Sequence, residues 1–378
     1  LSPVTLFDAQ YFITVVQRIA MNPLLEVRKR GQQIWLDNLS RTLLNDGELA
    51  SLIADDGLAG VTTNPAIFQK AITAGRYYAE ELEALKEKDL SAEARYERLA
   101  VTDVQRACDM LAPVFDRSRG DAGYVSLEVS PALANDEAGT VAAARRLREA
   151  VDRPNVLIKI PATNAGIHAI QTLIGEGVSI NVTLMFSLAD VDAVGQAYIR
   201  GIEQLRQSGG DISSVKSVAS VFLSRVDTLV DKRLEALGGD ATTLCGYSAV
   251  AMAKLAYQRY LTRFHGPEFA DLLNAGARPQ QLLWASTGTK NPSYDDLLYV
   301  EPLIGKETVN TVPDATLAAL RDHGKVAETI TKDLSRAESQ FTQLEALGID
   351  MNAVGEELKA DGLRQFEVAF ETLLATTA

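Results

Sequence analysis

A lysine, Lys159, lies inside the apolar segment 155–161, which reads N-V-L-I-K-I-P. Lysine is seldom fully buried in a folded protein unless it has a partner or a chemical role. Removing an amine from water favours its neutral form, which is the form that attacks a carbonyl carbon to make a Schiff base. This segment alone therefore leaves two interpretations open, a Schiff-base nucleophile or a structural lysine that pairs with a carboxylate or reaches solvent.

Further polar side chains stand inside or directly after other short apolar runs. Asn181 and Thr183 are two positions apart, so they project from the same face if their run is a strand. If the runs are parallel strands of one barrel, side chains at their ends gather around a single mouth, where chemistry takes place in such folds. Besides Lys159, the candidates for this ring are Asp37, Asn64, Glu128, Asn181, Thr183, Ser220, Arg225, Ser286 and Lys290.

Each candidate also has a structural alternative. Asp37 and Asn64 suit the N-cap of a helix, and Glu128 suits an ion pair with Lys159. The two polar residues of the 179–183 run could be ordinary strand residues, and the remaining cations could be surface charges. Together, however, the candidates supply one lysine, two carboxylates, two amides, hydroxyl groups and a separate cationic corner.

This combination indicates carbonyl chemistry on a lysine. An unperturbed lysine, with a pKa of about 10.4, is almost entirely charged at pH 7, so a Schiff-base enzyme must favour the neutral amine. Dehydration of the carbinolamine needs a proton shuttle, for which Glu128 is the candidate, directly or through a water. Cleavage of a carbon–carbon bond needs a base at the hydroxyl group of the departing carbon, for which Asp37 is the candidate.

The uncharged and cationic candidates fit a phosphorylated sugar. Asn64 and Asn181 can hydrogen-bond sugar hydroxyl groups without carrying charge. Arg225, Ser220 and Lys290 can bind a phosphate group, because guanidinium, ammonium and hydroxyl donors suit its oxygen atoms.

The elements that must position these residues alternate along the chain. Short apolar runs are separated by longer segments of helical periodicity, such as 48–54, 138–150 and 186–205. The expected strands are residues 33–36, 60–63, 124–129, 156–160, 179–183, 217–221, 282–286 and 309–311. Eight such repeats predict an α/β fold, a (β/α)8 TIM barrel, for which a doubly wound open sheet is the alternative.

Three segments are longer than barrel connections need to be. They are residues 68–119, residues 229–281 between the sixth and seventh strands, and the tail from residue 315, in which Gly324 and Gly348 are expected helix breaks. Each has helical periodicity, and no Pro- or Ser-rich spacer sets it apart. We therefore expect one barrel domain over residues 27–378, including helical insertions and C-terminal helices, after an amphipathic N-terminal extension of residues 1–26.

Composition excludes several classes of function. The formal charge of -13 argues against nucleic acid or anionic membranes as partners. No apolar run approaches the roughly 20 residues of a membrane helix, and the first residues lack the features of a signal peptide.

Two distant cysteines, Cys108 and Cys245, suit buried free thiols in a reducing cytoplasm. His168, His265 and His323 are scattered, and phosphate-binding glycine motifs are lacking, so the sequence predicts no metal and no nucleotide cofactor.

Several of these runs resemble the signature stretches of transaldolases, and they occur in that family's order. The likeness extends from about residue 27 to the C-terminus, and it is closest to the longer bacterial type of this class I Schiff-base aldolase superfamily. The matching stretches are W-L-D at 35–37, G-V-T-T-N-P-A-I-F at 60–68, S-L-E-V-S at 126–130, V-L-I-K-I-P-A-T at 156–163, I-N-V-T-L-M-F-S at 180–187 and A-S-T-G-T-K-N-P at 285–292.

The resemblance implies a role for each candidate. Lys159 would form the Schiff base, Asp37 would be the acid and base at the cleaved bond, and Glu128 would act through a water. The residues implied to bind substrate are Asn64, Asn181, Thr183, Ser220, Arg225, Ser286 and Lys290. Other branches of the family place an arginine shortly after the serine of the seventh strand, a position at which this chain offers Lys290 instead.

The resemblance also implies the reaction. The family transfers a dihydroxyacetone unit from sedoheptulose 7-phosphate to glyceraldehyde 3-phosphate in the non-oxidative pentose phosphate pathway, without a cofactor. The expected partners are therefore small sugar phosphates, and a homo-oligomer is compatible with the sequence.

Three rival functions differ from transfer in what they require. A fructose 6-phosphate aldolase uses the same barrel and lysine but releases the three-carbon unit to water, and Glu128 favours transfer. A catalytically silent sugar-phosphate binder would have lost the lysine or a carboxylate. A metal-dependent aldolase would need histidines at ligand spacing.

Overall fold

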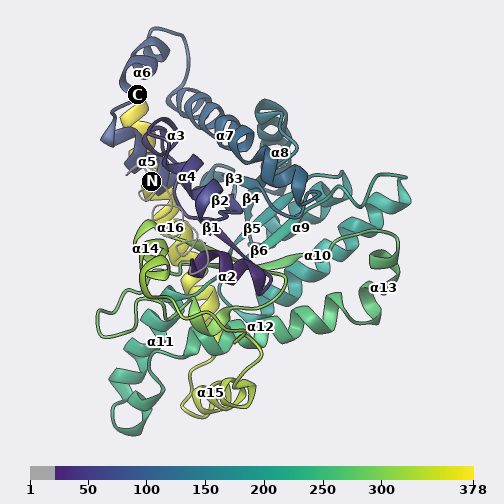
Figure 1. The fold of residues 1–378 in the computed structure, drawn as a ribbon, viewed down its shortest axis with the longest axis vertical. Helices are drawn as coiled ribbons and strands as arrows, with labels where there is room; N and C mark the ends of the chain where they lie inside the picture. The colour runs from purple at the N-terminus through teal and green to yellow at the C-terminus, as the bar shows by residue number, and fades with distance from the viewer. Residues whose placement is uncertain (1–21) are drawn as a thin grey trace, which may run out of the picture.

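Eight parallel strands close into a barrel in the order of the sequence (Figure 1). The computed structural model describes residues 22–378. The strands are β1 (Gln32–Leu36), β2 (Gly60–Val61), β3 (Tyr124–Glu128), β4 (Val156–Pro161), β5 (Ile180–Met185), β6 (Ser217–Phe222), β7 (Gln281–Ala285) and β8 (Thr308–Val312). The pairing of β8 with β1 closes the sheet, so the (β/α)8 barrel is confirmed and the open sheet is excluded.

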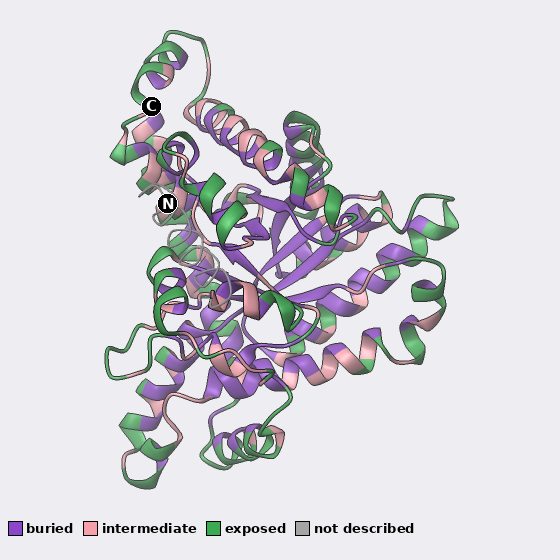
Figure 2. Ribbon diagram, viewed as in Figure 1, coloured by how far each residue is buried: buried purple, intermediate pink, exposed green. Residues whose placement is uncertain are grey.

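The strands are buried on both faces, because side chains fill the barrel and helices cover its outside (Figure 2). Every residue of β3, β4, β5, β6, β7 and β8 is buried. This explains why most of the strands appear in the sequence as short runs rich in apolar residues, although β8 reads T-V-N-T-V. A polar residue inside such a run consequently points into the barrel or toward its mouth.

The described helices lie around this sheet. Helix α2 (Pro23–Lys29) precedes β1. Between β1 and β2 lie α3 (Arg41–Asn45) and α4 (Glu48–Asp55), and between β2 and β3 lie α5 (Pro65–Ala74), α6 (Ala79–Lys86) and α7 (Ala92–Arg117). Next come η1 (Pro131–Leu133), α8 (Glu137–Val151), α9 (Asn164–Gly175) and α10 (Leu188–Gln207). The remainder are α11 (Ser224–Leu237), η2 (Gly239–Leu244), α12 (Ser248–Phe264), α13 (Pro267–Asn274), η3 (Glu301–Leu303), α14 (Asp314–His323), α15 (Leu334–Ala346) and α16 (Met351–Thr377).

The three long segments are helical, as expected. Of these helices, α16 matters most for the site, because it packs against α5, α7, α11 and β5 (Figure 1, yellow). Gly324 is the C-cap of α14, and Gly348, at φ +78°, follows α15, so both expected breaks are confirmed. The helix Pro23–Lys29 crosses the expected boundary at residue 26, while residues 1–21 of the expected extension lie outside the described residues. The division into an extension and a barrel domain stays a prediction.

The two cysteines differ in burial. Both are free thiols, and Cys108 is buried in α7. Cys245 is only partly buried, because it ends the short η2 helix at the surface, so the expectation of two buried thiols is wrong for this residue.

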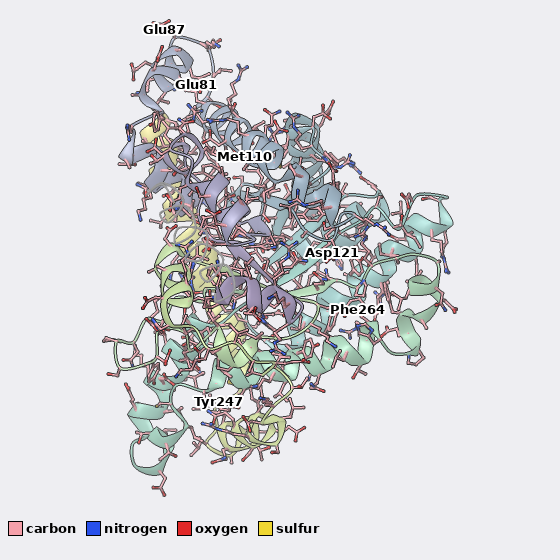
Figure 3. All side chains as sticks on the ribbon, in the orientation of Figure 1. Glu81, Glu87, Met110, Asp121, Tyr247 and Phe264 are labelled. Atoms are coloured by element: carbon pink, nitrogen blue, oxygen red, sulfur yellow. The ribbon has the colours of Figure 1, made fainter. Side chains whose placement is uncertain are left out.

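A buried ionic cluster joins α3 to the 68–119 insertion. Arg41 Nε donates to Asp103 Oδ1 over 2.8 Å, and the Tyr78 hydroxyl donates to Asp103 Oδ2 over 2.7 Å. Arg41 Nη2 also lies 2.7 Å from Glu81 Oε2, and Glu81 is labelled at the edge of the molecule in Figure 3. Asp103 is fully buried, so its removal would leave the guanidinium without its principal partner.

Asp103→Ala is expected to lower the free energy of unfolding by about 3 to 5 kcal/mol, because it removes the buried partner of the Arg41 guanidinium and of the Tyr78 hydroxyl and leaves Arg41 only the more exposed Glu81. Denaturant titration would measure the loss. The control is Arg76→Ala, which breaks an exposed ion pair with Asp46 and should have a far smaller effect. Equal effects of the two substitutions would contradict this account of the cluster.

Candidate active site

Three predicted site residues lie at one level of the barrel. Glu128 on β3 is in register with Lys159 on β4, and Lys159 is in register with Asn181 on β5. Adjacent parallel strands hold residues of one register side by side, about 4.8 Å apart. The structure therefore brings together the carboxylate, the amine and the amide.

Lys159 is buried, with 5% of its surface exposed, and both polar and aromatic groups lie near its amine. Its Nζ donates to the backbone oxygen of Thr63 over 3.0 Å and lies 3.1 Å from Glu128 Oε2. The ring of Phe366, from α16, lies with its centroid 5.9 Å from the same Nζ atom. Because the residue is buried, few water molecules can reach this amine.

Two carboxyl groups share this site. Burial raises the pKa of Glu128 against the opposing effect of the Lys159 ammonium. Burial also raises the pKa of Asp37, while the Lys159 ammonium and a hydrogen bond from Thr62 oppose the rise. Thr62 Oγ1 donates to Asp37 Oδ1 over 2.8 Å, which fixes the carboxylate at the end of β1. Two acids with raised pKa values next to a buried amine suit proton transfer to and from a bound substrate.

Asn181 is held by hydroxyl groups on both sides. Its Nδ2 donates to Ser126 Oγ over 2.9 Å, and its Oδ1 accepts from Ser220 Oγ over 2.7 Å. The structure thus places Ser220 inside the barrel, bonded to Asn181. Ser126 was not among the candidates, although it stands two residues before Glu128 on β3 and hence on the same face.

Thr183 carries a buried hydroxyl group without a hydrogen-bond partner among the described residues. It stands at an irregularity of β5, where the register with β6 shifts between Val182 and Met185. The next residue, Leu184, has φ 57°, a strained conformation for a leucine. Such bulges redirect side chains beside functional sites, and the unpaired hydroxyl can accept or donate a hydrogen bond to a bound molecule.

Asn64 caps a helix beside the site, as one of its two interpretations predicted. It is the N-cap of α5, where its Oδ1 accepts from the backbone N–H of Ile67 over 3.0 Å. It also follows Thr63 directly, whose carbonyl oxygen binds the Lys159 amine. Capping uses the side-chain oxygen, so the Nδ2 group keeps its donors for another partner.

The cationic corner lies where β6 and β7 end. The Cζ atom of Arg225 lies 5.9 Å from the ring centroid of Phe222, and its Nη1 is buried without a partner among the described residues. Burial lowers the pKa of Arg225, and Asp361 on α16 opposes this. Ser224 Oγ lies 2.8 Å from Ser286 Oγ, and Ser286 has φ 54°. Ser224 was not a candidate, although it directly precedes Arg225 in the chain.

Helix α16 packs closely against this cationic corner. A Cβ atom at Gly362 would lie 3.0 Å from Leu184 Cδ2 and 3.5 Å from Arg225 Nη1, so a larger residue there would crowd both side chains. The helix thereby joins the irregular end of β5 to the arginine. Nothing local in the sequence of the tail indicates this docking.

Lys290 is exposed on the loop that follows β7. Its positive charge slightly opposes the rise that burial causes in the pKa of Asp37. Two buried carboxylates of α11 anchor the same loop, since the Tyr299 hydroxyl donates to Asp227 Oδ2 over 2.9 Å and the Tyr294 hydroxyl to Asp231 Oδ2 over 2.8 Å. Helix α11 also carries Arg225, so these bonds set Lys290 and the arginine relative to each other.

Asp227 makes this anchor sensitive to pH. Burial raises its pKa from 3.8 to about 7, and the nearby Asp231 charge adds to the rise. Between about pH 4 and pH 7 the folded state holds a proton that the unfolded state has released, so this group's contribution to stability falls as pH rises. In Asp227→Asn the contribution is absent.

We therefore expect the wild-type free energy of unfolding to decline relative to Asp227→Asn between pH 4 and pH 7, by at most about 4 kcal/mol. Denaturant titrations of both proteins across this range would measure the difference. A difference that stays constant with pH would contradict the assignment.

Two further features bear on function. Among residues 22–378, no group of three or more His, Cys, Asp or Glu side chains is arranged to hold a metal ion. In the same range, no helix is long and apolar enough to cross a membrane.

The comparisons with known proteins agree with each other. The family described as Transaldolase/Fructose-6-phosphate aldolase matches residues 34–377. A protein named Transaldolase from Thiobacillus denitrificans is 53% identical over 356 residues, which cover 94% of this chain and 99% of that protein. One from Neisseria gonorrhoeae is 50% identical, with the same two coverages. Transaldolase 1 from Streptomyces coelicolor is 46% identical over 96% of each chain.

Proposed function

This chain belongs to the transaldolase and fructose-6-phosphate aldolase family, and we propose that it transfers a dihydroxyacetone unit through a Schiff base on Lys159. The donor is sedoheptulose 7-phosphate and the acceptor is glyceraldehyde 3-phosphate, which gives erythrose 4-phosphate and fructose 6-phosphate. The observation that carries this proposal is the closed setting of the Lys159 amine, between the Glu128 carboxylate and the Thr63 carbonyl oxygen.

The reaction begins at the amine. The neutral Nζ attacks the ketone carbon of the donor, and the resulting carbinolamine loses water as a Schiff base. Glu128 suits the proton transfers of this step, because it lies 3.1 Å from Nζ and its raised pKa lets it hold or release a proton. A water molecule is the proposed relay between the carboxyl group and the leaving hydroxyl group.

Asp37 performs the proton transfers of carbon–carbon cleavage. As a carboxylate it takes the proton of the C4 hydroxyl group, the C3–C4 bond breaks, and its electrons pass into the Schiff base to give an enamine. Erythrose 4-phosphate leaves as the aldehyde. The enamine carbon then attacks the aldehyde carbon of glyceraldehyde 3-phosphate, Asp37 returns its proton to the new hydroxyl group, and hydrolysis of the imine frees fructose 6-phosphate.

The remaining site residues hold the sugar phosphate. We assign the sugar hydroxyl groups to the Asn64 side-chain amide and to the Thr183 hydroxyl, which has no partner among the described residues. Asn181, held by Ser126 and Ser220, is assigned to the orientation of the substrate and of the relay water. The phosphate group is assigned to the cationic corner of Arg225, Ser286 and Lys290, to which Ser224 adds a second hydroxyl group.

Dependence on an acceptor tests this function. Fructose 6-phosphate would be supplied with and without erythrose 4-phosphate, and sedoheptulose 7-phosphate and glyceraldehyde 3-phosphate would be measured. Transfer requires that both products form rapidly only when the acceptor is present. Release of glyceraldehyde 3-phosphate and free dihydroxyacetone at the same rate without an acceptor would identify a fructose 6-phosphate aldolase instead.

The proposed setting follows from the same observations. The substrates are small sugar phosphates of carbohydrate metabolism, and the two free thiols suit the reducing cytoplasm. No cofactor has a step in this mechanism, since the lysine supplies the electron sink.

A further inference from the structure

A cavity of about 360 Å³ lies at the opposite end of the barrel from the Lys159 site. Its walls come from the segment after α7, the end of α8, and the residues that precede β4, β5, β6 and β7. Asp121, which precedes β3, marks this end of the barrel in Figure 3, on the other side from α16. We propose that this cavity binds a small molecule that carries two or more phosphate groups, independently of the sugar-phosphate site.

Positive charge converges on the cavity. Four arginines line it, Arg119, Arg148, Arg153 and Arg278, whereas Asp116 is the one carboxylate among its lining residues. Arg153 is paired with Asp109.

The other three arginines form no ion pair within residues 22–378, although acidic residues outnumber basic ones 50 to 37 over the whole chain. They come from three separate segments, so helical periodicity of one element does not explain their meeting. A cationic cavity in an acidic protein attracts anions selectively, because the surrounding surface repels them.

Backbone carbonyl oxygens hold the guanidinium group of Arg278 in place. Arg278 Nε donates to the carbonyl oxygen of Ser213 over 2.9 Å, and its Nη2 donates to that of Arg119 over 2.6 Å. A guanidinium has five N–H donors, so donors remain for a ligand. Arg119 itself has φ 55°, which is an uncommon conformation for a residue with a side chain. Fixed donors lose little entropy when they bind, and residues in such conformations are frequent at ligand sites.

The size and the walls of the cavity indicate the kind of anion. A volume of about 360 Å³ lies in the range of small-molecule sites and is several times larger than one phosphate group needs. The inner wall is apolar, where Phe115 and Tyr124 pack edge to face at 5.4 Å, next to Pro154 and Val156. Separated guanidinium groups above an apolar wall suit two or more phosphate groups on a compact organic body.

The cavity is distinct from the catalytic site. Val156 begins β4 and lines the cavity, whereas Lys159 lies three residues further along the same strand, or roughly 10 Å. None of the four arginines is a residue of the proposed mechanism. A ligand here therefore need not compete with the sugar phosphates.

Calorimetric titration of the full chain with inorganic pyrophosphate tests the proposal. The cavity variants are Arg148→Gln and Arg119→Gln, whose side chains are exposed and whose loss should not affect folding. Arg225→Gln removes the cation of the substrate corner, and Arg200→Gln removes an exposed arginine on α10 as a matched control for net charge. Hydrogen exchange with and without pyrophosphate would locate the bound anion.

We expect each cavity variant to raise the pyrophosphate Kd at least tenfold, while Arg225→Gln and Arg200→Gln leave the Kd of this site unchanged. Exchange protection should appear at residues 115–124 and 148–156. Loss of binding in Arg225→Gln with retention in the cavity variants would assign the anion to the substrate corner and overturn the proposal. Absence of binding at millimolar pyrophosphate, or an equal loss in Arg200→Gln, would overturn it as well.

Discussion

Lys159→Arg is expected to reduce turnover by at least about 10⁴-fold, the scale of loss seen when a covalent nucleophile is removed. A guanidinium stays protonated and cannot form an imine, so the covalent intermediate is lost even though the positive charge is kept. Borohydride reduction in the presence of fructose 6-phosphate, followed by peptide mass mapping, should give an adduct on Lys159 in the wild type and none in the variant.

Lys216→Arg is the matched control for this substitution. Lys216 is also a buried lysine of the barrel, and it pairs with Asp121 over 2.8 Å at the end remote from the site. Its replacement should leave turnover close to the wild-type value in the folded protein. Lys159→Met, a neutral residue of similar length, keeps the test valid if the larger arginine disturbs the fold. An adduct on another lysine, or turnover retained in both Lys159 variants, would refute the mechanism.

Asp37→Asn is expected to lower kcat by about 10² to 10⁴-fold, the usual contribution of a general acid or base. The amide can keep the hydrogen bond from Thr62 Oγ1, so the geometry should survive while proton transfer is lost. Borohydride should still trap fructose 6-phosphate on Lys159 in this variant, because Schiff-base formation precedes cleavage. If the yield of the trapped adduct fell by the same factor as turnover, Asp37 would act before carbon–carbon cleavage, in contradiction to the proposal.

The raised pKa of Asp37 also sets the direction of a pH effect. The carboxylate must be ionised to accept a proton, so turnover should fall as pH is lowered through a pKa above the ordinary value of 3.8. The negative charge of Asp314 contributes to that rise. In Asp314→Asn the acid limb of the kcat/KM profile, which reports the free enzyme, should therefore move to lower pH, with little change in kcat/KM at its maximum. A shift in the other direction would contradict the role of Asp37.

The strands could be predicted because each carries its own signal. All eight begin and end within two residues of the expected positions, because most strands that are buried on both faces are rich in apolar residues. The exception is β8, which reads T-V-N-T-V. The residues at the ends of these strands could also be identified, because a polar side chain in such a run is conspicuous. The register of the parallel strands then places Glu128, Lys159 and Asn181 side by side, so their proximity follows once the strands are identified.

Contacts between distant segments could not be predicted in this way. Phe366 belongs to a helix whose apolar positions predict burial but not the surface that it covers. In the sequence, nothing distinguishes Ser224 from any other serine at the start of a helix. Its relevance to the site follows only from its contact with Ser286 in the structure. Asn64 shows a different limit, since its Oδ1 caps α5 while its Nδ2 is left for another partner, so capping does not exclude the proposed substrate contact. Cys245 was misjudged because burial was inferred from residue type alone.

The position of α16 has a consequence for the order in which the protein matures. The eighth strand ends at Val312, and a barrel could close around it while the ribosome is still translating the residues that follow. Phe366 and Gly362, which complete the walls around Lys159 and Arg225, are added only later. We therefore expect the wall beside Lys159 and Arg225 to be completed only when the last helix has been translated and has packed onto the barrel.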